Sequence, residues 1–239
     1  YLRPETCQGI YVNFPNVVQS MRMKVPFGIA QVGKAFRNEI TPGHFTFRTR
    51  EFEQMEQQYF VHPDDKKDTF KMWKETRMQW YLDFGIKKEN LQFREHEKDE
   101  LAHYAAEAWD IEYNYPDMGF KELAGIHDRG DWDLSRHSEY SGEDLKYNDQ
   151  IKNEKFFPHI VETSDGADRA TLAFLIDAYD EVEARSGDDD AKHEKEFGST
   201  IRFTCMTEQE FFDRRHVMDK FLFGIFEGKH RKVVNELDI

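Results

Sequence analysis

The sequence predicts an α+β domain in which helices flank an antiparallel β-sheet. Residues 25–40 and 45–60 both have the composition of strands, and a short turn-forming segment separates them. Residues 64–86 carry aromatic side chains at helical spacing. Residues 156–185 combine a strand with a following helix. A hairpin together with helices at these positions indicates an α+β arrangement, in which the helices pack against one antiparallel sheet.

The two predicted strands enclose the segment TPGH (41–44) and pair in antiparallel fashion. Arg37 and Glu39 then share one face of the first strand. In the second strand alternate side chains share a face. One such face holds Thr46, Arg48, Arg50, Phe52, Gln54, Glu56 and Gln58. This row of cations, a flat ring, amides and a carboxylate is more typical of a ligand-binding floor than of a solvated surface.

The helix predicted after Pro63 has acidic residues at its start and ends at Gly85. Its apolar stripe consists of Phe70, Trp73, Trp80, Tyr81 and Phe84. A second helix is expected over residues 99–113. Residues 119–137 are expected to form a short strand and a loop.

A strand through Ile160 places Glu162 and Ser164 on one face, and Gly166 marks the turn into a helix. This helix is apolar almost all round from Ala170 to Tyr179, so we expect it to be buried. Arg169 lies in its first turn, where a cation opposes the helix dipole. An anionic ligand would explain this position.

Composition limits the function. The chain has 239 residues and a formal charge of −14, which argues against a broad surface for DNA or other nucleic acid. A local basic patch from Arg37, Arg48, Arg50 and Arg169 remains open. The two cysteines form no CxxC motif, which fits a reducing cytoplasm and argues against a structural metal. The sequence contains no run of 18 apolar residues, so a membrane-spanning helix is not expected.

Four motifs, in order along the chain, resemble those of one enzyme family. FRNE, a turn-rich loop, RTREF and EQME resemble motif 2 of class II aminoacyl-tRNA synthetases, and GADR opening an apolar helix resembles motif 3. YLRPETCQGIYVNF and GFKELAGIHDRGDWDLSRH narrow the resemblance to the dimeric glycyl-tRNA synthetases of bacteria and eukaryotes. The resemblance covers about residues 1–180 and implies a class II synthetase-like antiparallel sheet.

The resemblance implies ATP-dependent activation of glycine to glycyl-adenylate and transfer to tRNA(Gly). It also implies Mg²⁺ as a cofactor and a homodimer in the full-length protein. Attack of a carboxylate on the α-phosphorus of ATP brings two anions together, so such a site must neutralise charge and align the reactants. A protein nucleophile is not needed.

By resemblance, Arg37 and Arg169 are the catalytic residues. Arg37 would contact the α-phosphate and the glycine carboxylate, Arg48 and Arg169 the γ-phosphate, and Phe52 the adenine ring. Glu39 would orient the adenine amino group or the ATP end of the site. Glu122 corresponds to the family's position for ATP and magnesium. The expected ATP-binding residues are Arg37, Asn38, Glu39, Phe47, Arg48, Thr49, Arg50, Glu51, Phe52, Glu122, Leu123, Gly166, Ala167, Asp168 and Arg169.

Carboxylates around a small cavity suit the α-ammonium group of glycine. The expected glycine-binding residues are Glu5, Phe52, Glu53, Gln54, Met55, Glu56, Glu162, Thr163, Ser164, Asp165 and Gly166. Rejection of alanine by lost contacts alone is limited to about 1–3 kcal/mol, so we expect a rigid wall near Ser164 and Glu56.

The chain departs from the family pattern at several positions. Gly130 stands where a threonine is usual, Cys7 where alanine is usual, and Asp165 where a small or apolar residue is common. Asp165 is expected to add a charge beside the glycine pocket.

The first residues lack an initiator Met and do not resemble a signal peptide. Motif 1 and the α/β anticodon-binding domain are not recognisable either, so we expect a piece of a longer protein. The expected organisation is a catalytic core over residues 1–185, followed by an acidic linker and a helical segment over 186–239. A polar connector spans residues 186–196, and an amphipathic helix is expected over 208–228.

Two alternatives remain open from sequence. One is a non-catalytic synthetase paralogue that binds RNA or a protein partner. The other is a class II synthetase for another small amino acid, such as threonine, proline or serine.

Overall fold

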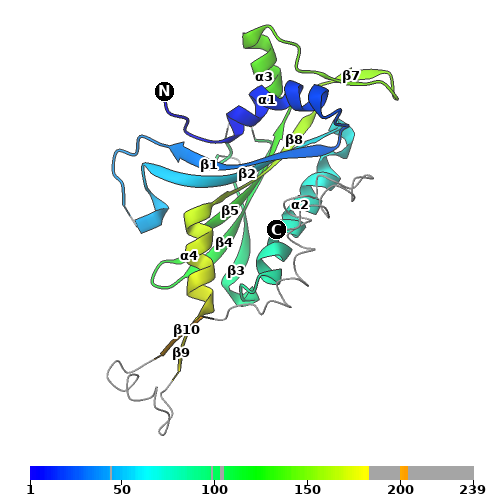
Figure 1. Cartoon of the computed structure of the whole chain (residues 1–239). Helices are drawn as coiled ribbons and strands as arrows, with labels where there is room; N and C mark the ends of the chain where they lie inside the picture. Colours follow the sequence, from blue (N-terminus) through cyan, green and yellow to red (C-terminus); the bar gives the residue numbers. More distant parts are fainter. Residues whose placement is uncertain (44, 98, 103–104, 183–199, 204–239) are drawn as a thin grey trace, which may run out of the picture.

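A computed structural model describes residues 1–182 and 200–203, apart from residues 44, 98 and 103–104 (Figure 1). Its centre is a six-stranded sheet of order β1-β2-β8-β5-β4-β3, in which all neighbours are antiparallel. These strands are β1 (Phe27–Phe36), β2 (Glu51–Val61), β3 (Leu91–Glu95), β4 (Glu107–Tyr115), β5 (Gly119–Gly130) and β8 (His159–Gly166). The predicted α+β class is confirmed.

Two small antiparallel pairs accompany the sheet: β6 (Tyr147–Asp149) with β7 (Glu154–Phe156), and β9 (Tyr179–Val182) with β10 (Thr200–Phe203). The α-helices are α1 (Cys7–Ser20), α2 (Lys66–Asp83), α3 (Trp132–Ser141) and α4 (Ala167–Ala178). Single 3₁₀ turns are η1 (Phe45–Phe47), η2 (Pro63–Asp65) and η3 (Lys88–Asn90). Among the described residues, none of the helices has the length and apolar character needed to cross a membrane.

One face of the sheet, here called the core face, is covered by α2 and α4 (Figure 1). Trp73 and Tyr81 of α2 and Ala173 of α4 pack on Ile111 and Ile126 of the sheet. The aromatic stripe predicted for residues 64–86 faces this core, and Gly85 ends the helix region with a φ of +99°. Burial of these large rings supplies much of the stability of the domain.

The opposite face, here called the polar face, carries the side chains of Phe52, Gln54, Glu56, Gln58, His127, Glu162 and Ser164. At one end of this face α1 and α3 close a second apolar cluster, in which Tyr11 and Phe14 pack near Phe60, Leu134 and Ile160. In Figure 1 these two helices lie together at one end of the sheet. The polar side chains next to this cluster are therefore held on a rigid support.

The antiparallel hairpin is confirmed, but the boundaries predicted for its strands were wrong. β1 ends at Phe36 and β2 begins at Glu51, while residues 45–47 form η1. Within the loop, the Arg37 N–H donates to the Arg50 carbonyl oxygen at 2.9 Å. Arg48 and Arg50 therefore lie on a closed loop and not on the strand.

The helix predicted over residues 99–113 was also wrong, because β4 occupies residues 107–115. Ala108, Ile111, Tyr113 and Tyr115 are buried between β3 and β5, and sheet pairing overrides the helical propensity of this Ala- and Glu-rich stretch.

Residues 119–137 form more regular structure than the expected short strand and loop. They contain β5, which has 12 residues, and the start of α3. A β-bulge between Asp128 and Gly130 interrupts the pairing of β5 with β8.

The strand and helix predicted over 156–185 are present as β8 and α4, but α4 is only partly buried. Ala170, Ala173 and Asp177 are buried, whereas Leu175 is 51% exposed. The expected connector over 186–196 and the helix over 208–228 lie outside the described residues.

Candidate active site

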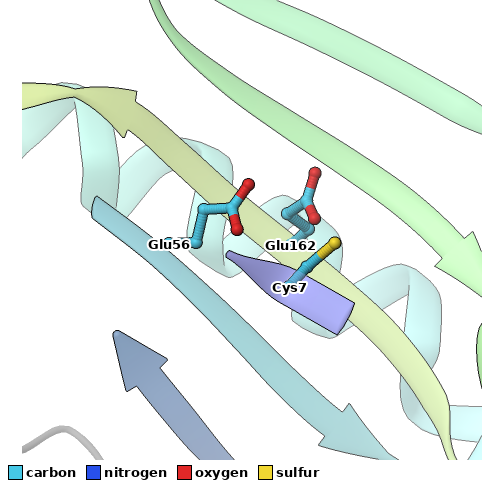
Figure 2. A group of neighbouring side chains, drawn as sticks. All are labelled: Cys7, Glu56 and Glu162. Carbon is cyan, nitrogen blue, oxygen red and sulfur yellow. The ribbon is translucent and has the colours of Figure 1, made fainter. Parts of the chain in front are cut away.

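The polar face contains a buried group of three side chains that come from three different elements. Cys7 begins α1, Glu56 lies on β2 and Glu162 lies on β8. The Cys7 Sγ and one carboxylate oxygen from each glutamate lie within 4.8 Å of one another. Figure 2 shows the three side chains gathered over the adjacent strands β2 and β8. The pairing of β2 with β8 places the two acidic residues on one face of the sheet.

Glu162 is held by polar partners on several sides. Its Oε2 accepts from Gln58 Nε2 at 2.6 Å and from Arg129 Nη1 at 3.0 Å, and its Oε1 lies 2.9 Å from His127 Nδ1. Burial alone would raise the pKa of Glu162, but Arg129 and then His127 lower it below its ordinary value. Glu162 is therefore an ionised carboxylate in the interior of the domain.

Arg129 is a buried residue of this group that the sequence analysis did not identify. It lies at the β-bulge of β5 and is buried. Its Nε and Nη2 donate to the two carboxylate oxygens of Asp133 at 2.7 and 3.0 Å, and its third nitrogen reaches Glu162. This fork geometry locks the guanidinium in place. The segment DRGDWD (128–133) places Arg129 four residues before Asp133, a spacing that allows the two to pair. The contact of Arg129 with Glu162 depends on the fold.

His127 supports the same carboxylate from β5. Burial opposes protonation of His127, but the hydrogen bond and charge of Glu162 outweigh burial and raise its pKa. On the next strand, His96 Nε2 lies 2.8 Å from Asp110 Oδ2. Polar groups thus continue across the face from β8 to β3.

Glu56 differs from Glu162 in its surroundings. Its Oε2 accepts from the Thr6 hydroxyl and its Oε1 accepts from Gln54 Nε2 at 3.3 Å. Burial and then the negative charge of Glu162 raise the pKa of Glu56. Gln54 is only 8% exposed, and its Oε1 has no hydrogen-bond partner. One ionised carboxylate, one protonatable carboxylate and an unsatisfied acceptor together suit a cationic ligand with several N–H groups.

Glu5 and Ser164 complete the surroundings of Glu56. Ser164 is directly opposite Glu56 in the β2–β8 register. Glu5 is half-buried, and its Oε1 accepts from Gln8 Nε2 at 2.9 Å. The charge of Glu5 contributes to the raised pKa of Glu56, so the two carboxylates act on the same space.

A second group, rich in arginine, lies at the loop between β1 and β2. Arg37 is exposed, and its guanidinium carbon lies 5.1 Å from the centre of the Phe52 ring. Arg50 Nε donates to the Glu39 carbonyl oxygen at 3.0 Å, and Arg48 Nε lies 3.5 Å from the Glu39 carboxylate. The predicted Arg37, Glu39, Arg48, Arg50 and Phe52 are therefore brought together, although by a loop.

Arg169, in the first turn of α4, connects this loop to Glu122 of β5. Its Nη2 donates to the Phe47 carbonyl oxygen at 2.9 Å, and its Nη1 lies 3.3 Å from Glu122 Oε2. Its guanidinium carbon lies 5.2 Å from the centre of the Phe47 ring. The predicted Arg169 and Glu122 thus meet beside the residue that precedes Arg48. Cations from two segments are available to one polyanionic ligand.

Several residues predicted for the site point away from the polar face. Glu51 pairs with Lys34 at 2.9 Å in solvent, and Met55 and Leu123 pack in the core. By strand alternation, Glu53 and Thr163 also face the core side. Asn38, Thr49 and Asp168 lie near the arginine-rich loop or the start of α4, where Gly166 and Ala167 form the strand-to-helix turn.

The expectation that Asp165 adds a charge beside the pocket was wrong. Asp165 follows Ser164 on β8, so its side chain points to the core face. There it accepts hydrogen bonds from Arg77 and from the Tyr81 hydroxyl, both of α2. Its charge is compensated inside the core.

Residues 1–179 match the family model described as tRNA synthetase class II core domain (G, H, P, S and T). The glycine–tRNA ligase of Treponema denticola is 58% identical over 192 residues, which cover 80% of this chain and 42% of that protein. The glycine–tRNA ligase of Geobacillus kaustophilus is 58% identical over 187 residues, covering 78% and 40%. This chain thus spans about two fifths of the length of these relatives.

Among solved structures, seryl-tRNA synthetase from Pyrococcus horikoshii complexed with ATP has a TM-score of 0.57 and 16% identity. The match covers 75% of this chain and 40% of that chain. At this identity the likeness concerns the fold.

Proposed function

Because this chain belongs to the family of class II tRNA synthetase core domains, we propose that it is the glycine-activating part of a glycine–tRNA ligase. The observation that carries the proposal is the pair of buried carboxylates Glu56 and Glu162 on the polar face, with Arg37 over Phe52 farther along the same face of β2. An ammonium group could pair with the carboxylates and a phosphate group with Arg37. The high identity to glycine–tRNA ligases supports glycine as the amino acid.

The proposed reaction has two steps. An oxygen of the glycine carboxylate attacks the α-phosphorus of ATP, a new O–P bond forms, and the bond to the bridging oxygen breaks to release pyrophosphate. A ribose hydroxyl at the 3′ end of tRNA(Gly) then attacks the glycyl carbonyl carbon, and AMP leaves. The first step concentrates negative charge, so positioned cations lower its barrier.

Arg37 is proposed to stabilise the charge that develops between the carboxylate and the α-phosphate. Its guanidinium lies next to Phe52, which is proposed to stack on adenine. Arg48 and Arg169 are proposed to bind the terminal phosphate. Glu122 and the register-opposed Glu112 offer the carboxylate oxygens that suit Mg²⁺, which would supply charge neutralisation on the phosphates.

Glu162 is proposed to bind the α-ammonium group of glycine, because it stays ionised in the interior. Arg129 acts as a positioning residue, since it holds the Glu162 carboxylate and is itself held by Asp133. Glu5, Glu56 and Ser164 are proposed to surround the same group.

For the full-length protein we further propose a cytoplasmic homodimer. The support is the motif resemblance to dimeric glycyl-tRNA synthetases and the absence of CxxC motifs. Sedimentation of the full-length protein would test the dimer.

Amino-acid-dependent exchange of pyrophosphate into ATP tests the proposed function. Exchange with glycine, and none with threonine, proline or serine, is the expected result. Exchange with another of these amino acids would contradict the assignment to glycine. A folded chain that exchanges with none of them would favour a non-catalytic paralogue.

Arg37→Ala is expected to reduce glycine-dependent exchange by at least about 100-fold, the scale found when one preorganised charge-stabilising group is removed. The fold should persist, because the Arg37 side chain is exposed. Thermal unfolding checks the fold, and exchange kinetics check the activity. Arg136→Ala is the matched control, since Arg136 forms an exposed pair with Glu139 on α3 and should leave exchange unchanged. Wild-type exchange by Arg37→Ala would contradict the role given to this residue.

Binding of a glycyl-adenylate analogue is expected to tighten as the pH rises and to level off above about 7. Burial and the Glu162 charge raise the pKa of Glu56 from 4.5 to about 7. A bound ammonium favours the ionised form, so below this pH binding releases a proton from Glu56, and affinity changes by up to about tenfold per pH unit.

Titration calorimetry in two buffers of different ionisation enthalpy measures this proton release. Glu56→Gln should remove the pH dependence, and a flat profile in the wild type would contradict the prediction. Without ligand, the raised pKa means that Glu56 stabilises the fold fully below pH 4.5, and that this contribution is lost as the pH rises through about 7.

A further inference from the structure

We propose that Thr6 is a positioning residue of the glycine site: its hydroxyl orients the Glu56 carboxylate and favours its ionised form, so that Glu56 can accept a hydrogen bond from the ammonium group of bound glycine. The inference rests on the proposed function and deepens it. Glu56 is the group that meets the ligand, and Thr6 acts through it.

Thr6 immediately precedes α1, at the position where a threonine commonly caps a helix. A capping hydroxyl accepts a hydrogen bond from a backbone N–H of the first helical turn. The Thr6 side chain makes no such bond, and its φ of −92° and ψ of −19° differ from the extended backbone of capping residues. The hydroxyl is used instead for a partner outside the helix.

That partner is Glu56 on β2. Thr6 is fully buried, and its hydroxyl donates to Glu56 Oε2. Gln54 Nε2 donates to Glu56 Oε1 at 3.3 Å, so each carboxylate oxygen has a donor and the rotation of the group is fixed. A carboxylate can accept further hydrogen bonds at both oxygens. One oxygen of Glu56 and one of Glu162 lie within 4.8 Å of each other, a spacing that a single ammonium group can bridge (Figure 2).

Glu56 needs this donor because its surroundings oppose ionisation. Burial, and next the charge of Glu162, raise the pKa of Glu56 to about 7, whereas the hydrogen bond from Thr6 lowers it. The other titratable groups that face Glu56 are Glu5 before α1, Cys7 on α1 and Arg129 on β5. Glu5 opposes ionisation, Arg129 favours it, and burial keeps the Cys7 thiol neutral. Thr6 therefore supplies a neutral donor that offsets part of the cost of a buried charge.

The test measures the affinity of glycyl-sulfamoyl-adenosine for the wild-type 239-residue chain and for Thr6→Val between pH 6 and pH 8.5, by titration calorimetry. Thr6→Val keeps the branched shape of the side chain and removes the hydroxyl. The ratio of the two affinities cancels the titration of the ligand's own amino group. Without the hydrogen bond, Glu56 should ionise about one pH unit higher. The wild-type advantage is therefore expected to be at least about tenfold at pH 6 and to shrink about fivefold or more by pH 8.5, where Glu56 is ionised in both proteins.

Three further variants control for packing and folding. Thr6→Ser keeps the hydroxyl and should bind like the wild type at every pH. Thr6→Ala removes the hydroxyl together with the methyl group, should show the same pH-dependent loss, and takes the place of Thr6→Val if that variant does not fold. Thr171→Val is the matched control, because the exposed Thr171 hydroxyl donates to the Ala167 carbonyl oxygen of α4 at 2.9 Å. Circular dichroism establishes that each variant is folded.

A ratio of wild-type to Thr6→Val affinity that stays constant with pH would overturn the role of Thr6 and leave the proposed function standing. This holds for equal affinities and also for a constant loss, which would indicate a structural role alone. If the wild-type chain bound no glycyl-sulfamoyl-adenosine at any pH, the proposed function and this inference would both be overturned.

Discussion

Asp165→Ala is expected to lower the free energy of unfolding by about 3–5 kcal/mol, because it removes one partner of a buried charge pair. The side chains of Arg77 and Asp165 are 0% and 1% exposed. Asp165 accepts from Arg77 and from the Tyr81 hydroxyl, and the variant takes this carboxylate away from the Arg77 charge. Urea unfolding followed by circular dichroism measures the loss.

The double variant Arg77→Met with Asp165→Ala separates charge compensation from packing. Removing both charges is expected to recover much of the stability lost in Asp165→Ala, since an apolar replacement of a buried pair is often nearly neutral. Asp144→Ala is the exposed control. Asp144 pairs with Lys155 in solvent, and its removal should leave the unfolding curve unchanged. An Asp165→Ala curve that also superimposes on the wild type would contradict the placement of Asp165 in the core.

Glu162→Gln is expected to reduce glycine-dependent exchange by about 30-fold to several thousandfold, the equivalent of about 2–5 kcal/mol for loss of a buried, hydrogen-bonded charge. The amide keeps the size of the side chain but removes the negative charge proposed to bind the α-ammonium group. The Michaelis constant for glycine should rise, whereas the affinity for ATP alone should change little. Steady-state exchange with glycine and with ATP as the varied substrate measures both.

Glu139→Gln is the matched control for this variant. Glu139 pairs with Arg136 at 2.7 Å, but both side chains are about half exposed on α3. Exchange should remain at the wild-type level. If Glu162→Gln behaved like Glu139→Gln, Glu162 would not bind the substrate ammonium group.

Strand alternation predicted correctly that Glu162 and Ser164 share a face of β8 and that Phe52, Gln54 and Glu56 share a face of β2, because alternation in a strand is a local property. The pairing of β2 with β8 then brings Glu56 opposite Ser164 on one face. Strand alternation also places Asp165, which follows Ser164, on the core face. The expectation of a charge beside the glycine site came from the family resemblance and not from this alternation. The Asp165 partner Arg77 lies 88 residues away, so the buried pair depends on how α2 packs on the sheet.

The errors concern features that depend on tertiary contacts. Arg129 reaches Glu162 because β5 pairs with β8 in the sheet, and α3 supplies Asp133, which holds the guanidinium. The stretch over residues 99–113 has good helix formers, yet β3 and β5 pair with it as β4. The loop that carries Arg48 is closed by backbone hydrogen bonds, and composition could not distinguish it from an extended strand.

The central claim is that an ionised carboxylate on the polar face binds the ammonium group of glycine beside the nucleotide site. The affinities of glycyl-sulfamoyl-adenosine and of its acetyl counterpart, which lacks only the amino group, test this claim most directly. The glycyl compound is expected to bind at least about 30-fold more tightly at pH 7.5, and Glu162→Gln should remove most of that difference. Equal affinity of the wild-type chain for the two compounds would contradict it.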